Sequence, residues 1–291
     1  MAKKKAKKNK QRGRFPWLLL VVLLAIGALF YDSNTRIVVS EYELSYDTLP
    51  ESFDGFRIVA LSDIHAAMFG KDNERLVAKV RVAKPDIIAI TGDFTDGSDK
   101  LPLDEQLAVA EALVEKLVRI APVYYITGNH EWDDGGIWEL LSILEDHGVT
   151  ILRNRYTLLE SAGDAIILAG VDDPNGPADM ISRGDFVESI YEREGDGFVI
   201  MLEHRNNNLP LYSSLGVELV LCGHAHGGII RIPFTDGLMG PDRQWFPTYT
   251  NGIYTMDGTN MLVSRGVGNH TGLPRLLNNP HIVVAILRGE S

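Results

Sequence analysis

The chain has 291 residues, and its 45% hydrophobic content is enough for one large domain or two small ones. The formal net charge of −11 does not suit binding to a nucleic-acid backbone, which requires clusters of lysine and arginine. The single cysteine, Cys222, excludes a disulfide within the chain.

The N-terminus has a distinct charge and hydropathy pattern. The first fourteen residues hold eight lysines and arginines and no acid, which leaves 20 basic and 39 acidic residues in the rest of the chain. Residues 15–31 follow as an apolar run that only Pro16 and Gly27 interrupt, at the short end of what a membrane-spanning helix needs. Basic residues ahead of such a run place the N-terminus in the cytoplasm. We therefore expect a basic cytoplasmic tail over 1–14 and a transmembrane signal anchor over 15–31. The protein is then a single-pass protein of the cell membrane with an extracytoplasmic body.

A cleavable signal peptide is the alternative to an anchor. Residues 25–27 (Ala-Ile-Gly) offer a small-residue cleavage site, but this site lies inside the apolar run. No cysteine for lipid attachment lies nearby, and no paired arginines precede the run. These features favour the uncleaved anchor.

The body alternates predicted strands and helices through its first half. Runs rich in Val, Ile and Leu predict buried strands over 57–61, 86–90, 123–126, 165–171, 198–202 and 218–221. Helical spacing of apolar residues predicts helices over 72–83, 104–119 and 136–146. Short runs separated by Gly and Asn predict antiparallel strands of a second sheet over 229–232, 253–256, 261–264 and 282–287. No linker or repeat is visible, so we predict one α/β domain over 41–291, with two packed mixed β-sheets flanked by helices.

Five of these strands are followed directly by residues that bind metals. The candidates are Asp63, His65, Asp93, Asn129, His130, His204, His224 and His226. Taken alone, a histidine after a strand is usually a solvated loop residue, and Gly-Asp usually forms a turn. However, five of the chain's eight histidines lie in these segments, and every segment has the same position relative to its strand. Because sites in open sheets lie at the carboxyl ends of strands, the pattern predicts one metal centre built from five loops.

The types of ligand indicate the chemistry of this centre. Imidazole and carboxylate without thiolate suit Zn, Mn, Fe or Ni. Without His130, the seven remaining candidates are too many for one ion and fit two ions that share a bridge. Asp93 is the natural bridge, because a carboxylate has two oxygens. Two divalent ions roughly 3.5–4 Å apart can clamp a phosphoryl group and convert a bound water into hydroxide.

The motif order Asp-x-His, Gly-Asp, Gly-Asn-His, His, Gly-His-x-His resembles the calcineurin-like metallophosphoesterases. Within that family it is most similar to the membrane-associated bacterial branch of YkuE-like and YaeI-like phosphodiesterases. The resemblance covers about residues 56–287 and implies a four-layer αββα sandwich with a dinuclear metal site.

The resemblance also implies a role for each candidate. One ion takes Asp63, His65, Asp93 and His226, and the other takes Asp93, Asn129, His204 and His224. His130 stands beside the ions without binding them and protonates the leaving group.

Several features lie outside the motif set. We expect Glu203 and Arg205, which flank His204, to face solvent, and His281 to be structural. Asp172 and Asp173 resemble a family loop near the site and are expected to be structural or to face substrate, not to bind metal.

Two loops after the last ligands add to the predicted pocket. The long loop over 234–249 is expected to form a pocket wall, and its Trp245 and Phe246 either contact a lipid, a sugar or a membrane, or pack beneath the loop. The glycine-rich turn over 264–269 permits the backbone to approach a phosphate.

The sequence therefore predicts an extracytoplasmic, metal-dependent phosphoesterase, of the diesterase or pyrophosphatase type, that uses bound hydroxide. A lipid-linked or membrane-proximal phosphate is the expected substrate, because an anchor confines the site to the membrane. The alternatives are a phosphomonoesterase with a soluble substrate and a catalytically weak, phosphate-binding regulatory protein, which predicts a lost ligand or a lost His130. A purely structural membrane protein leaves the seven ligands without an explanation.

Overall fold

A computed structural model describes residues 15–96, 101–133, 135–177, 181–232, 235–241, 243–269 and 272–290. The body contains two six-stranded mixed sheets. The first has the order β1 (Val38–Tyr46), β12 (His281–Gly289), β2 (Arg57–Leu61), β3 (Ile87–Thr91), β4 (Val123–Ile126), β5 (Thr150–Ile151). The second has the order β10 (Gly252–Met256), β11 (Thr259–Val263), β9 (Leu219–Cys222), β8 (Val199–Leu202), β7 (Asp164–Gly170), β6 (Arg155–Ser161).

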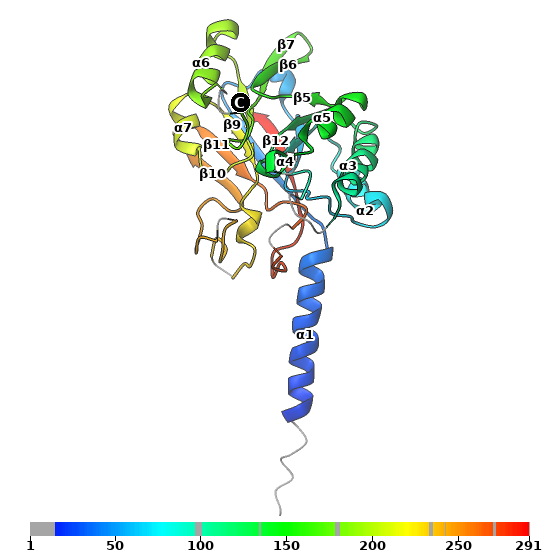
Figure 1. The fold of residues 1–291 in the computed structure, drawn as a ribbon. Helices are drawn as coiled ribbons and strands as arrows, with labels where there is room; N and C mark the ends of the chain where they lie inside the picture. Colours follow the sequence, from blue (N-terminus) through cyan, green and yellow to red (C-terminus); the bar gives the residue numbers. More distant parts are fainter. Residues whose placement is uncertain are drawn as a thin grey trace, which may run out of the picture.

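Helices cover the outer faces of both sheets (Figure 1). On the first sheet lie α2 (Glu74–Val82), α3 (Leu103–Leu117) and α5 (Ile137–Asp146), and on the second lie α6 (Arg183–Glu194) and α7 (Leu209–Ser214). The short α4 (Asn129–Asp133) follows β4, and the 3₁₀ turns are η1 (Glu51–Phe53), η2 (Lys71–Asn73) and η3 (His226–Gly228).

The alternation of side chains along the strands produces three apolar cores. In β2, Ile58 packs between the sheets, whereas Val59 packs beneath the helices of the first sheet. In β8, Ile200 likewise packs between the sheets, and Val199 packs under α6 and α7. Central strands such as β3, β8 and β9 are buried on both faces, so the body has the predicted arrangement of two mixed sheets flanked by helices, in four layers.

The C-terminal strands differ from the prediction. Residues 282–287 belong to β12, which pairs antiparallel with β2 and parallel with β1 in the first sheet. In the second sheet, β11 pairs parallel with β9 and antiparallel with β10. Residues 229–232 contribute no strand, because Ile230 makes only an isolated bridge to Leu276. The expectation of four antiparallel strands in one second sheet is therefore wrong.

The N-terminal helix α1 (Phe15–Thr35) extends away from the body (Figure 1). Its 21 residues correspond to about 32 Å at the usual helical rise, close to the ~30 Å of a bilayer core. The part from Trp17 to Thr35 is long and apolar enough to cross a membrane and is almost entirely exposed. The helix continues beyond the predicted end at Tyr31 to Thr35. The basic tail over 1–14 lies outside the described residues.

Candidate metal centre

The metal-ligand candidates meet at one edge of the two sheets. Asp63 and His65 follow β2, Asp93 follows β3, and Asn129 and His130 open α4 after β4. From the second sheet, His204 follows β8, and His224 and His226 follow β9. Two groups have ligand atoms within 4.8 Å of one another and could hold a metal ion: Asp63, His65, Asp93 and His226, and Asp93, His204 and His224.

Asp93 belongs to both groups. Its Oδ2 lies 3.1 Å from His204 Nε2 and 3.7 Å from His65 Nε2. Asn129 Oδ1 lies 3.2 Å from His204 Nε2, which places this amide oxygen in the second group. His130 donates its backbone N–H to Asp93 Oδ1 at 3.0 Å, while its ring Nε2 is 3.9 Å from Asp93 Oδ2. The His130 side chain is 12% exposed, whereas the His65 and His204 side chains are fully buried.

Hydrogen bonds to backbone carbonyls orient two histidines at the centre. His204 Nδ1 lies 2.8 Å from the carbonyl oxygen of Thr91, and His65 Nδ1 lies 3.1 Å from that of Thr95. A carbonyl can only accept, so these bonds place a proton on Nδ1 and direct Nε2 toward Asp93. This is the orientation that metal-binding histidines take when a carbonyl fixes their tautomer.

Burial and neighbouring charges set the ionisation of the group. Burial, and then the charge of His204, lowers the pKa of His224 to about 3. Burial and the neighbouring His65 hold the pKa of His226 well below its usual value. Burial opposes ionisation of Asp93, but the adjacent imidazoles outweigh it and hold its pKa well below the usual range. Burial acts against ionisation of His204, but Asp93 outweighs it and raises the pKa of His204 to about 10. The neutral His224 and His226 beside the ionised Asp93 fit a divalent cation.

Five of the metal-ligand candidates have a backbone dihedral angle φ that non-glycine residues rarely adopt. Asp63, His65, Asp93, His224 and His226 all have positive φ, between 47° and 64°. Non-glycine residues rarely adopt this region, and such strain of order 1–3 kcal/mol per residue concentrates at functional sites. The surrounding sheets therefore hold these loops in conformations that isolated chains disfavour.

Two glycines allow these loops to approach each other. A Cβ at Gly128 would lie 2.2 Å from Asp93 Oδ1, and a Cβ at Gly223 would lie 2.3 Å from Asp63 Oδ2. Both positions exclude a side chain because the carboxylates occupy the space. Gly266 and Gly268 also pack against the loop after β2, and the Gly268 N–H donates to Asp63 O at 2.6 Å. The turn expected to approach a phosphate thus supports Asp63 instead.

Glu131 is a buried residue that the sequence analysis did not select. Its carboxylate accepts backbone N–H groups from Gly128 at 2.6 Å, Asp93 at 3.1 Å and Thr95 at 3.2 Å, and from Phe94. Burial and the charge of Asp93 raise the pKa of Glu131 to about 7, while its N–H donors act in the opposite direction. One side chain therefore joins the loop after β3 to the start of α4. The signal available in the sequence is a glutamate three residues after Gly128, the spacing of a capping box.

The charged neighbours of His204 differ from the prediction. Glu203 is buried and forms an ion pair with Arg183 through Arg183 Nε, and it also accepts from Asn208 at 2.7 Å. Arg205 forms two hydrogen bonds with Asp173, at 2.8 and 3.0 Å. Neither residue simply faces solvent, because each has a partner on a neighbouring segment.

The remaining sequence candidates lie near the centre without joining it. Asp172 accepts from Thr127 and forms an ion pair with Arg153, so it has the structural role that was expected. His281 is fully buried at the start of β12 and accepts from the Arg265 N–H, also as expected of a structural residue.

A cavity of about 630 Å³ opens onto the metal-ligand candidates. Its lining includes Asp93, Asn129, His130, His224 and His226, together with Met239, Arg243 and Leu273 from later loops. The described part of the 234–249 loop therefore forms a wall, as predicted. Trp245 and Phe246 are 65% and 67% exposed, which excludes the alternative that they pack beneath the loop.

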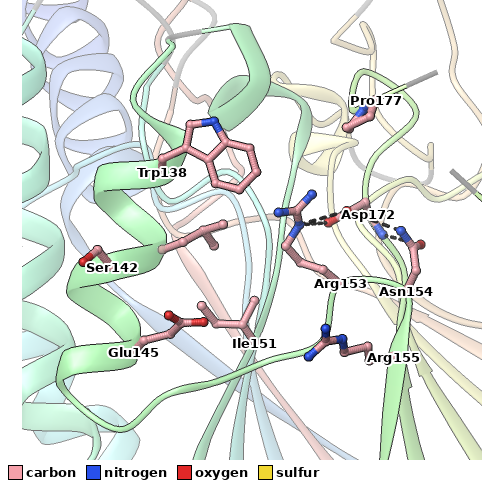
Figure 2. A pocket seen from close by; sticks show the side chains of 10 residues that line it. Trp138, Ser142, Glu145, Ile151, Arg153, Asn154, Arg155, Asp172 and Pro177 are labelled. Carbon is pink, nitrogen blue, oxygen red and sulfur yellow. Dashed lines mark hydrogen bonds and ion pairs between the residues drawn. The ribbon is translucent and has the colours of Figure 1, made fainter. Parts of the chain in front are cut away.

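A second cavity, of about 500 Å³, lies beside α5 and contains none of the metal-ligand candidates. Figure 2 shows Arg153 directed toward Asp172 there, with Trp138 above it. Arg153 also lies over the rings of Trp132 and Trp138, at 4.9 and 5.2 Å from the centroids. These contacts involve Arg153 and Asp172, whereas the metal-ligand candidates line the larger cavity.

Residues 56–228 match the family model of the calcineurin-like phosphoesterases, and the chain belongs to this family of phosphoester hydrolases. It is 30% identical to the uncharacterized metallophosphoesterase YkuE of Bacillus subtilis, over 99% of this chain and all of that one. It is 28% identical to a transmembrane protein with a metallophosphoesterase domain from Danio rerio, over 93% of this chain and 62% of that longer protein. Among solved structures, TT1561 of Thermus thermophilus matches with a TM-score of 0.47 and 16% identity, over 75% of this chain and 91% of that one.

We predict that Glu131→Gln weakens metal binding without removing a ligand. The amide nitrogen of glutamine cannot accept hydrogen bonds, so at least one of the N–H donors around Glu131 loses its partner. Loss of such a support costs roughly 10- to 100-fold in metal affinity. An unpaired buried donor also lowers the free energy of unfolding by about 1–3 kcal/mol. Metal titration and denaturant unfolding measure both effects. The exposed Glu139→Gln is the control, and equal metal affinity in the two variants contradicts the role of Glu131.

Proposed function

We propose that this phosphoester hydrolase is a phosphodiesterase or pyrophosphatase with two metal ions, acting on a phosphate at or near a membrane. The observation that carries the proposal is the pair of ligand groups that share Asp93 at the floor of the 630 Å³ cavity. A shared carboxylate is what a two-ion site requires, and a cavity of this volume accepts more than a phosphate group.

The two groups divide the ligands between the ions. Asp63, His65 and His226 would hold one ion, Asn129, His204 and His224 would hold the other, and Asp93 would bridge them. When bound, such ions polarise the phosphoryl group and lower the pKa of a water. The distances from Asp93 Oδ2 to His65 and His204 support the bridging role, because this oxygen faces both groups.

His130 has the position expected of a proton donor. Its ring stands edge-on to His65, with centroids 5.0 Å apart, and it lines the cavity, whereas His65 and His204 are fully buried. Its backbone N–H also orients Asp93. A ring at the cavity surface can reach the leaving-group oxygen of a bound ester, and Arg243 in the cavity wall supplies positive charge for a phosphate.

The proposed location follows from α1. A helix of this length and hydropathy leaves directly from the body, and the basic residues ahead of it favour a cytoplasmic N-terminus. The body then lies outside the cytoplasmic membrane, and its substrates are those found at that surface. A phosphodiester or pyrophosphate linked to a lipid has the required chemistry.

Replacing the proposed bridge tests the two-ion site. We expect Asp93→Asn to weaken both ions, by more than the roughly 10- to 100-fold that a lost supporting contact costs. Asp63→Asn should weaken only one ion, because Asp63 belongs to a single group. Metal content after dialysis and titration calorimetry measure the stoichiometry, with the exposed Asp104→Asn as the control. Two ions bound to Asp93→Asn at wild-type affinity contradict the bridging assignment.

Replacing His130 separates proton donation from metal binding. A positioned acid contributes roughly 10²–10⁴-fold to rate, so His130→Ala should lose activity by about this factor with an alkyl leaving group. The loss should shrink with p-nitrophenolate, which needs little protonation, and both ions should remain. The control is His147→Ala, which removes a histidine paired with Glu111. Equal losses for both leaving groups together with a missing ion make His130 a ligand instead.

The topology has its own test. In cells with permeabilised outer layers and an intact cytoplasmic membrane, we expect added protease to digest the body while residues 1–14 stay protected. Protection of the body until the cytoplasmic membrane is lysed reverses the proposed orientation. A mature protein that begins near Ala28 replaces the anchor with a signal peptide.

A further inference from the structure

The end of α1 is attached to the body by hydrogen bonds to one loop. Asn34 Nδ2 donates to Arg275 O at 2.9 Å, and Asn34 Oδ1 accepts from Arg275 N at 3.1 Å. Ser33 Oγ accepts from Leu277 N at 2.8 Å, and Asn279 Nδ2 donates to Asp32 O at 2.7 Å. These bonds involve backbone groups of both the loop and α1, and together they fix the direction in which α1 leaves the body.

The loop that holds α1 also reaches the metal centre. The buried Arg275 side chain donates to the carbonyls of Gly268 at 3.1 Å and Arg265 at 2.8 Å. Gly268 in turn donates to Asp63 O. Leu273, from the same 272–279 loop, lines the cavity that contains the metal-ligand candidates. The 272–279 loop therefore contacts both the end of α1 and the cavity.

Large apolar side chains are exposed on the two loops that contribute to the cavity wall and near the end of α1. Trp245 and Phe246 project from the 235–249 loop, and Leu273 and Leu277 from the 272–279 loop. Met68, which is 63% exposed, lines a smaller cavity together with Asn34 at the end of α1. In Figure 1 the 235–249 loop (yellow to orange) and the 272–279 loop (orange-red) both descend on the side from which α1 leaves. We call these five residues the apolar collar.

The charge around the collar also suits a lipid surface. The body as a whole is acidic, yet Arg36, Arg231 and Arg243 lie on or beside these segments. Among the described residues there, they stand against the acids Asp32, which pairs with Arg36, and the exposed Asp236. At the opposite end of the body, α6 exposes Glu188, Glu192 and Glu194 and no large apolar side chain. Tryptophan and arginine are both favoured at the interface between lipid headgroups and water. The apolar part of each side chain can lie in the lipid while its polar group stays hydrated.

We propose that the apolar collar inserts into the headgroup region of the bilayer that α1 crosses. The mouth of the metal cavity is thereby held against the membrane surface, so that the site takes phosphate esters directly from the lipid phase. The inference rests on the membrane anchoring proposed above. The collar would give the body a second contact with the bilayer, at its surface, in addition to the spanning helix. The fold would then determine the side from which substrate enters the cavity.

Fluorescent labels on the full-length protein test the contact. The native Cys222 is buried, so Trp245→Cys and Leu277→Cys each provide one accessible thiol. Trp138→Cys is the matched control, because Trp138 is 61% exposed on α5, away from the collar. The proteins are reconstituted in phosphatidylglycerol–phosphatidylethanolamine vesicles, with nitroxide-labelled lipids or aqueous iodide as quenchers.

We expect the labels at 245 and 277 to be quenched by nitroxide lipids and protected from iodide, and the label at 138 to show the reverse. If the protein floats with the vesicles but all three labels respond alike, the collar is wrong while the anchor stands. If the protein does not float with the vesicles, both the anchor and the collar are wrong. Neither readout depends on enzyme activity.

A kinetic comparison tests the consequence for substrate entry. Burial of one large apolar side chain changes an equilibrium by roughly tenfold or more. The double variant Trp245→Ser with Leu277→Ser should therefore lose about tenfold in kcat/KM toward the p-nitrophenyl ester of phosphatidic acid in these vesicles. Activity toward soluble bis(p-nitrophenyl) phosphate should stay at the level of Trp138→Ser. An equal loss on both substrates overturns the proposal, because it indicates a disturbed site.

Discussion

The candidate metal centre depends on two close contacts between loops, one between Asp93 and Gly128 and one between Asp63 and Gly223. The loop after β3 packs Asp93 against Gly128, and the loop after β2 packs Asp63 against Gly223, in spaces where a Cβ cannot fit. This approach joins the two sheets, since Gly223 follows β9 of the second sheet and Asp63 follows β2 of the first. The positive φ values of the metal-ligand candidates go with these contacts, because each loop turns sharply after its strand. The packed sheets supply the stabilisation that such backbone strain requires.

The arrangement of the ligands could be predicted because it depends on local order. An apolar run followed directly by a polar ligand places that ligand at a strand end, and parallel neighbours such as β2, β3 and β4 end at the same edge. The partners of the last strands could not be predicted in this way. Nothing within residues 282–287 indicates that β12 inserts between β1 and β2, because an apolar strand buried on both faces fits either sheet.

The residues that support the ligands were harder to find for a related reason. Glu203 is charged and sits beside a ligand, so a solvated position was a reasonable expectation until Arg183, twenty residues earlier, proved to be its partner. Glu131 serves donors on a loop nearly forty residues away in sequence. A buried charge is tolerated only with its partners, and the sequence does not record which distant groups those partners are. Local sequence therefore predicts the metal-ligand candidates, whereas the residues that hold them in place are defined only by the tertiary structure.

Arg275 connects the end of α1 with the loops that carry the metal-ligand candidates. Its hydrogen bonds, among those of the described residues, go to carbonyl oxygens and not to a carboxylate. Burial lowers its pKa to about 10, against the effect of the nearby Asp63, which still leaves the guanidinium charged at neutral pH. The same residue is bonded through its backbone to Asn34 at the end of α1. A change in the direction of α1 therefore acts on a segment that packs against the backbone of Asp63, a metal-ligand candidate.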